Sequence, residues 1–334
     1  LNYAFGGNWM PVYDFSKATS IVSLDADFLG AGPMQVSNTR GWVAGRKPNH
    51  GKMSRVWIAE SALSVTGAKA DERQAMRPAD ILALHPSDTF TINGAGSLSS
   101  EQQQWAKKME KDLLQAGKHG LVIAGASQPP MVHYLAALMN ERLGAVGTTV
   151  SYRQVDGGNK QTLADVSAGM KDGSIQGAIV LGGNPAFDAP SELDFATALE
   201  ALPFSIHLCY YDNETSKACK WHVNAAHWLE TWSDGQSADG TTCIGQPLIE
   251  ALFGGLSSSE FLAILAGEKI TDSHSLVRNT FNPNADQWNP AWRKAVHDGV
   301  VANTATLEAP PVNRTMFTDT TTPANSGTTV LFIP

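Results

Sequence analysis

The chain has 334 residues, of which 43% are hydrophobic and 17% are charged, and its formal net charge is −8. This composition can bury the core of one large or two ordinary domains, which excludes wholesale disorder. An acidic chain without a cluster of lysine and arginine also disfavours nucleic acid or an anionic membrane surface as a partner.

Four short, continuous, β-branched runs predict buried strands, and each is followed by a turn. The runs are Ser20–Leu24, Arg55–Ala59, Gly120–Ala124 and Gly177–Leu181. Because polar and apolar residues do not alternate along them, the runs are typical of parallel strands that are covered on both faces.

Helices are predicted between these strands. The clearest is Ser100–Ala116, with Ser99 or Ser100 as its cap and apolar residues four positions apart. The others are Pro130–Leu143, with proline in its first turn, and Ser191–Leu202, which begins with a Ser-x-x-Asp cap pattern. Alternation of strand and helix predicts an α/β fold with two doubly wound, mainly parallel sheet units.

Composition along the chain suggests three parts. Leu84–Ser99 is rich in Pro, Ser, Gly and Thr, and it predicts a linker between a first α/β unit (1–95) and a second one (96–300). Residues 301–334 are dense in Thr, Pro, Ala and Asn, which favours an extended tail that lies on another surface.

Cysteine content and hydropathy further limit the classes of protein to which this chain could belong. Cys209, Cys219 and Cys243 are too few for a four-thiolate cluster, and they are interpreted as unreactive thiols, with a Cys209–Cys219 disulfide as the alternative in an oxidising compartment. No apolar run approaches the ~20 residues that span a bilayer. The chain begins at Leu1 without a signal-like segment, and we interpret it as mature, processed or partial.

Two glycine turns are the candidate ligand sites. Gly125–Ser127 and Gly182–Pro185 each follow a predicted strand and precede a helix, which is where open α/β sheets bind ligands. Glycine there lets the backbone approach a phosphate. Neither turn matches a dinucleotide or Walker A motif, and a tight strand-to-helix turn needs glycine in any case.

Other polar residues carry weaker signals. His222 and His227 are five positions apart, which does not place them on one helix face, so packing is favoured over a metal site. Asp25 and Asp27 form an acidic pair at a strand end. Four further acidic residues are interpreted as solvated turn residues: Asp212, Glu214, Asp234 and Asp239. No motif of a catalytic nucleophile is present, so no catalytic residue and no metal ligand is assigned. Asn289–Arg293 is either a docking element or a packed surface loop.

Several segments in order resemble the molybdopterin oxidoreductases of the dimethyl sulfoxide reductase type. In that family a Gly-x-Asn-Pro-like turn lies near the pterin-guanine-dinucleotide cofactor, and Gly182, Gly183, Asn184 and Pro185 match it. Further matching stretches are Ala70-Asp71, Met76–Pro78, His222–Glu230, Gly240-Thr241 and Gln246–Leu248.

The resemblance extends to one branch, the B subunit of bacterial alternative complex III, in which a molybdopterin-like domain is fused to an iron–sulfur domain. The segments that carry it are Tyr13–Ala18, Ser23–Leu29, Glu60, Thr66–Asp71, Tyr211–Ser216, Trp221-His222 and Leu229–Trp232. Together the matches cover most of residues 10–300.

The chain departs from the active members of the family in two places. Glu60-Ser61-Ala62 stands where they have Asp-Pro-Arg, which removes an arginine that could pair with an anion. Glu230–Ser233 replaces their Glu-x-x-Gly and brings the bulk of Trp232 toward the expected pocket. The four-cysteine runs of the fused iron–sulfur domain are missing, so that module is either not included or a separate chain.

The resemblance therefore implies a non-catalytic scaffold domain of a membrane-bound quinol oxidoreductase, working in respiratory or photosynthetic electron transport. Residues Gly182–Pro185 would be a vestigial pterin pocket, and the chain itself would hold no cofactor. Iron–sulfur clusters and c-type haem are expected in the rest of the subunit or in partner subunits, and the location would be the periplasmic face of the inner membrane. The alternatives are a catalytic fragment of a true molybdopterin enzyme and a free-standing nucleotide-binding module.

Overall fold

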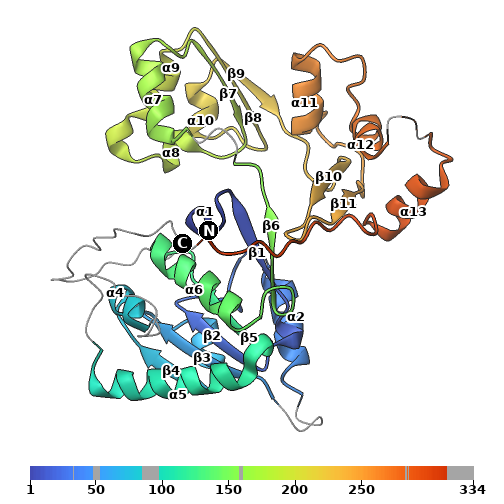
Figure 1. Ribbon diagram of the computed structural model, residues 1–334. Helices are drawn as coiled ribbons and strands as arrows, with labels where there is room; N and C mark the ends of the chain where they lie inside the picture. Colours follow the sequence, from blue (N-terminus) through green and yellow to red (C-terminus); the bar gives the residue numbers. More distant parts are fainter. Residues whose placement is uncertain are drawn as a thin grey trace. The chain divides into compact units, whose positions relative to one another are not determined.

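The computed structural model describes residues 1–32, 34–47, 53–84, 98–157, 161–282, 284 and 286–313 (Figure 1). The chain divides into two compact units. Unit 1 consists of Leu1–Gly157 with Thr306–Pro334, and unit 2 consists of Gly158–Ala305.

Unit 1 is built on a parallel sheet with the strand order β4-β3-β2-β5. Its strands are β2 (Ser20–Leu24), β3 (Arg55–Glu60), β4 (Glu72–Ala75) and β5 (Gly120–Ala124). The three strands predicted for this part of the chain are confirmed, and the second continues by one residue to Glu60. All three are buried, as the continuous apolar runs require.

Helices and an antiparallel ribbon complete unit 1. The helices are α1 (Asn2–Phe5), α2 (Gln35–Ala44), α3 (Val65–Lys69), α4 (Pro78–Ile81), α5 (Ser100–Ala116) and α6 (Pro130–Arg142). The ribbon pairs β1 (Trp9–Tyr13) with β6 (Val150–Gln154). Helix α5 has the predicted bounds and a capping box in which Ser99 and Gln102 bond to each other's backbone N–H groups.

Both faces of this sheet are covered, so the fold is doubly wound. Side chains of α5 and α6 pack with Val22 and Trp57 on one face. Ile21 and Leu121 point to the other face, where they pack with Phe15. Alternate residues of a strand point to opposite faces, so two separate apolar clusters on one sheet explain the unbroken apolar runs.

The boundary between the units differs from the predicted one. Strand β5 pairs with β2, with Leu121 beside Ile21, so residues after 96 belong to the first sheet and the division falls at Gly157. Sequence-neighbouring elements are not always sheet neighbours, because a parallel crossover can return to the far side of an earlier strand. Of the predicted linker Leu84–Ser99, residues 85–97 lie outside the described residues.

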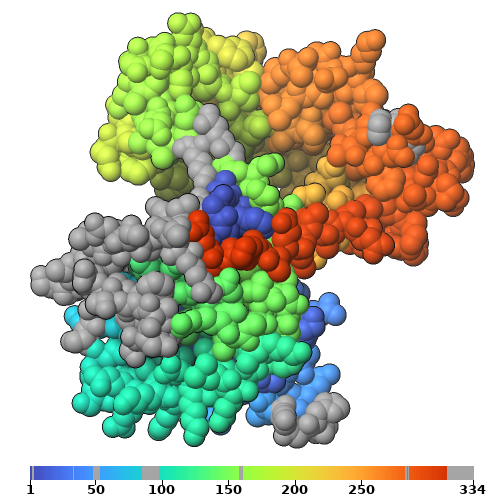
Figure 2. All heavy atoms as spheres, viewed as in Figure 1, coloured from blue at the N-terminus to red at the C-terminus, as the bar shows by residue number. Residues whose placement is uncertain are grey.

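From Thr306 onward, the described part of the C-terminal segment belongs to unit 1. Glu308 forms an isolated bridge with Tyr152, and Asn313 donates a backbone hydrogen bond to Ala4. Figure 2 shows this segment, in red, against the first residues of the chain, in dark blue. Residues 306–313 are thus extended chain lying on the surface of unit 1, as predicted for the tail, whereas residues 301–305 belong to unit 2 and include a turn. Residues 314–334 lie outside the described residues.

Unit 2 contains a second parallel sheet, with the strand order β7-β8-β9. Its strands are β7 (Gly177–Leu181), β8 (Phe204–Cys209) and β9 (Trp221–Asn224), and a separate hairpin joins β10 (Ser233–Gln236) to β11 (Thr242–Gly245). The helices are α7 (Leu163–Asp172), α8 (Pro185–Asp188), α9 (Phe195–Glu200), α10 (Glu214–Ala218), α11 (Ser258–Leu265), α12 (Ser273–Phe281) and α13 (Pro290–Asp298).

Two predictions for unit 2 are wrong in detail. Strand β7 is confirmed, but Ile179 and Leu181 are about two-fifths exposed because β7 is an edge strand and α11 packs on β8 instead. The predicted helix Ser191–Leu202 is broken at Asp194, whose φ of 44° is left-handed. A 3₁₀ turn precedes that residue and α9 follows it.

Candidate functional site

The Gly182–Pro185 turn lies at the carboxyl end of β7 and leads into α8. Gly182 and Gly183 both have left-handed backbones, with φ of 69° and 71°. Such conformations cost a side-chain-bearing residue roughly 1–2 kcal/mol, so the two glycines are required by the turn itself. A Cβ on Gly182 would meet no atom within 4 Å, so the space beside the turn is open.

Hydrogen bonds of the Asn184 side chain link this turn to the next strand-to-helix connection. Its Nδ2 donates to the Glu214 carboxylate at 2.7 Å, and its Oδ1 accepts from the backbone N–H and the hydroxyl of Thr215 at 3.1 and 2.9 Å. The buried Thr215 hydroxyl also accepts the N–H of Ala186 at 3.0 Å. The polar groups of the two connections are therefore satisfied by each other.

The connection after β8 adds a carboxylate beside the turn. Asn213, the N-cap of α10, donates to the carbonyl of Gly183 at 3.3 Å. The hydrogen bond from Asn184 lowers the pKa of Glu214 below its usual value, with a smaller contribution from Lys217. Glu214 is thus held in its anionic form next to the glycine turn, where it repels a phosphate.

Two histidines contact Ser216 in the second of these connections; His207 is buried and His222 is partly exposed. The Ser216 hydroxyl is 2.8 Å from Nδ1 of His207 and 2.9 Å from Nδ1 of His222, and it also contacts the carbonyl of Tyr211 at 3.1 Å. A hydroxyl has one hydrogen, and the carbonyl can only accept it. This arrangement favours the Nδ1–H form of both imidazoles, each donating to Ser216.

His207 is fully buried, and its Nε2 has no hydrogen-bond partner among the described residues. Burial lowers the pKa of His207, while the backbone of Gly182 and Gly183 acts in the opposite direction to a smaller extent. The lowered pKa favours the neutral form of the His207 imidazole. The strand register places His207 beside His222, which spacing along the sequence could not indicate.

The carboxyl edge of the first sheet is occupied by acidic side chains. Asp25 accepts the backbone N–H of Ser61 at 3.1 Å, and Asp27 accepts that of Thr66 at 2.8 Å. Glu60 accepts the hydroxyl of Ser64 at 2.6 Å. Backbone N–H groups at strand ends are the donors that cradle phosphate in α/β folds, and here the chain's own carboxylates use them.

Glu60 also forms an ion pair with an arginine of the neighbouring strand. It is 1% exposed and lies 2.5 Å from Nε of Arg73 on the neighbouring strand β4. The sequence comparison predicted the loss of an arginine after β3. In the structure an arginine from another strand neutralises the acid, and its guanidinium is committed to that pair.

Glycine is required in the Gly125–Ser127 turn because of a close backbone contact, not because of a left-handed conformation. A Cβ on Gly125 would lie 1.9 Å from the carbonyl oxygen of Asp25. Gln128, just after the turn, donates to the Asp25 carboxylate at 2.9 Å. The glycine therefore allows two backbones of unit 1 to cross closely.

The remaining candidate residues have structural partners. Both carboxylate oxygens of Glu230 accept backbone N–H groups. The Trp232 ring packs edge-to-face against His274 and tilted against Trp292 in an aromatic cluster. His227 packs against Tyr210 and Trp228. Two predictions are corrected: Asp234 lies in strand β10, not in a turn, and Asn289 caps α13, so Asn289–Arg293 begins a helix.

Three further observations concern the described residues alone. The three cysteines are free thiols, so the alternative Cys209–Cys219 disulfide is not formed. No group of three or more His, Cys, Asp or Glu side chains is arranged to hold a metal ion in the described ranges. None of the helices described is both long enough and apolar enough to cross a bilayer.

Comparison with known proteins shows that this chain resembles a solved structure in its fold. No protein-family model and no curated protein sequence matches the chain. Among solved structures, acetylene hydratase from Pelobacter acetylenicus matches with a TM-score of 0.55 and 9% sequence identity, over 80% of this chain and 49% of that one. The chain thus spans about half the length of the structure it matches, and the predicted α/β fold is confirmed.

Proposed function

We propose that this chain is a cofactor-free, molybdopterin-oxidoreductase-like scaffold domain in a membrane-bound quinol oxidoreductase of the alternative complex III type. The fold likeness supports the superfamily, because acetylene hydratase is an enzyme of the dimethyl sulfoxide reductase superfamily. The branch rests on the ordered sequence segments given above, and the scaffold role rests on the chemistry of the two sheet edges.

The observation that supports the scaffold role is that carboxylates accept N–H groups at the ends of the strands, where α/β folds can bind phosphate. Ser61 and Thr66 donate their backbone N–H groups to Asp25 and Asp27 in unit 1. In unit 2, anionic Glu214 is hydrogen-bonded to Asn184 in the glycine turn. A pterin dinucleotide carries a diphosphate, so it would have to displace these acids or lie against them.

These carboxylates disfavour a pterin dinucleotide, which supports the proposal. In this proposal the glycines of the Gly182–Pro185 turn keep a strand-to-helix connection that the cofactor no longer uses. The domain holds an iron–sulfur module and a multihaem cytochrome c subunit in place on the periplasmic face of the inner membrane, and it attaches to the membrane through its partners only.

One observation favours a second function, that of a catalytic fragment of a true molybdopterin enzyme. The space beside Gly182 is open, since a Cβ there would meet nothing within 4 Å. A dinucleotide could approach the backbone at this point if Glu214 turned away. Extraction of a pterin from the chain would separate the two functions.

Affinity isolation of the tagged chain from native membranes in a mild detergent tests the partners. We expect it to bring down c-type haem, visible in the absorption spectrum, together with iron and no stoichiometric molybdenum or tungsten. Untagged membranes taken through the same steps are the control. A chain that is recovered alone as a soluble monomer would indicate a free-standing module and would contradict the proposal.

A further inference from the structure

A pocket of about 460 Å³ lies in unit 2, and no residue of either glycine turn lines it. It is formed by the β10–β11 hairpin, helix α12 and the segment that begins at Val301. Pockets that hold small molecules have volumes of roughly 300–1,000 Å³ and combine apolar walls with a few polar groups. This one has the appropriate size.

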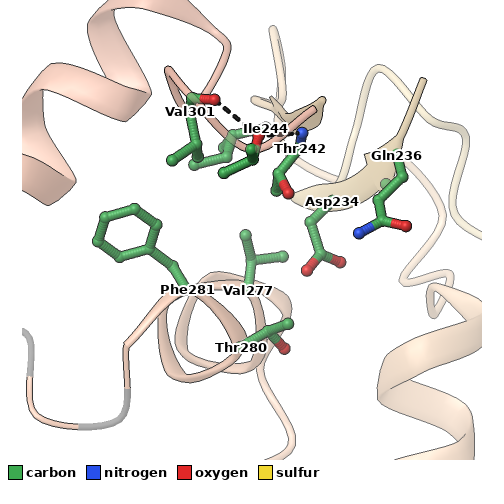
Figure 3. A pocket seen from close by; sticks show the side chains of 10 residues that line it. Asp234, Gln236, Thr242, Ile244, Val277, Thr280, Phe281 and Val301 are labelled. Carbon is green, nitrogen blue, oxygen red and sulfur yellow. Dashed lines mark hydrogen bonds between the residues drawn. The ribbon is translucent and has the colours of Figure 1, made fainter. Parts of the chain in front are cut away.

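Apolar side chains form one part of the wall. Ile244 and Val277 are 7% and 3% exposed and belong to a core cluster with Trp292, which fixes their positions. Phe281 and Val301 continue this surface, and Figure 3 shows both at the end of the pocket opposite Gln236. A ligand's apolar portion therefore has a preformed place to bind.

Polar groups gather at the other end. Asp234, Gln236 and Thr242 from the hairpin lie together there, and Thr280 of α12 faces them (Figure 3). The Thr280 hydroxyl already donates to the carbonyl of Leu276 at 3.1 Å, so toward the pocket it can only accept.

The charge of the pocket comes from Asp234. No hydrogen bond or ion pair joins its carboxylate to another described residue, and no lysine, arginine or histidine is among the described residues of the lining. Arg278 follows Val277 on α12 but does not line the pocket. The Asp234 carboxylate is exposed and unpaired, so it favours a ligand donor that carries positive charge.

We propose that this pocket binds a small organic cation: a protonated primary amine with an aryl or branched alkyl tail. The ammonium group donates to Asp234 and Thr280, and the tail lies against Val277, Phe281 and Val301. The aromatic face of Phe281 adds a favourable contact for an aryl tail. This assignment is independent of the proposed function, because it uses none of the residues of either glycine turn.

Calorimetric titration of the full 334-residue chain with 2-phenylethylamine at pH 7 tests the proposal. We expect saturable binding, and about tenfold weaker binding of the neutral 2-phenylethanol and of the anionic 3-phenylpropionate. Asp234→Asn should weaken amine binding about tenfold, because it removes the charge and keeps the shape.

Two further variants keep the test decisive. Asp188→Asn removes an exposed acid of the same unit that does not line the pocket, and it should leave binding unchanged. Thr280→Trp, at an exposed position of α12, should fill the polar end and abolish binding. The proposal is overturned if the amine does not bind, if the alcohol binds equally well, or if Asp234→Asn has no effect.

Discussion

Gly125→Ala should lower the stability of unit 1 by about 3 kcal/mol, because the added methyl has no space in the fold. Its Cβ would lie 1.9 Å from the carbonyl oxygen and 2.6 Å from the carbonyl carbon of Asp25. Those atoms are backbone, so the ends of β2 and β5 would have to separate. Urea unfolding followed by tryptophan fluorescence measures the change, since Trp57 is buried in this sheet.

Gly32→Ala is the matched control for that substitution. Gly32 lies in the same unit, and a Cβ there would meet no atom within 4 Å. We expect a change of at most about 0.5 kcal/mol. If Gly125→Ala lowered the free energy of unfolding as little as Gly32→Ala does, the close approach of the two backbones would not be the reason for the glycine. A contact with a ligand would then be the better explanation.

Glu60→Ala should destabilise unit 1 by about 3 kcal/mol, because it removes the buried partner of Arg73. Glu60 is 1% exposed and also accepts the hydroxyl of Ser64 at 2.6 Å. Arg73 is 32% exposed at its side chain, so solvent compensates part of its lost ion pair and the effect belongs at the lower end for buried pairs. The midpoint of urea unfolding provides the measurement.

Two comparisons make the result specific to the pair. Glu72→Ala removes an exposed acid next to Arg73 on the same strand and should change stability by less than about 0.5 kcal/mol. A double-mutant cycle with Arg73→Ala should give a favourable coupling between Glu60 and Arg73. Purely additive losses would mean that Glu60 acts through packing alone.

Much of the fold could be predicted from short patterns. The runs at Ser20–Leu24 and Gly120–Ala124 are strands because they are apolar and β-branched, and Ser99 caps α5 as its sequence position indicates. These features depend on neighbours within a few residues. The helix break at Asp194 was missed because a left-handed non-glycine residue has no reliable local signal.

Features that depend on strand order could not be read from the chain. The sheet neighbour of β5 is β2, a pairing of residues about 100 positions apart, and the unit boundary follows from it. For the same reason His207 and His222 meet at Ser216 without a motif.

The glycine turn at Gly182–Pro185 was found from its sequence, whereas the carboxylates that accept hydrogen bonds from neighbouring connections were not identified as such. Asp25 and Glu214 were interpreted as an acid at a strand end and a solvated turn residue. Their hydrogen bonds to Ser61 and Asn184 appear only when the connections are brought together in space.

Pterin extraction from the natively isolated complex tests the central claim most directly. The chain is separated, oxidised under acid conditions and assayed for the fluorescent pterin product, with a known molybdopterin enzyme as the positive control. The account predicts fluorescence at the level of the blank. A pterin in stoichiometric amount would contradict it and would favour the alternative of a catalytic molybdopterin fragment.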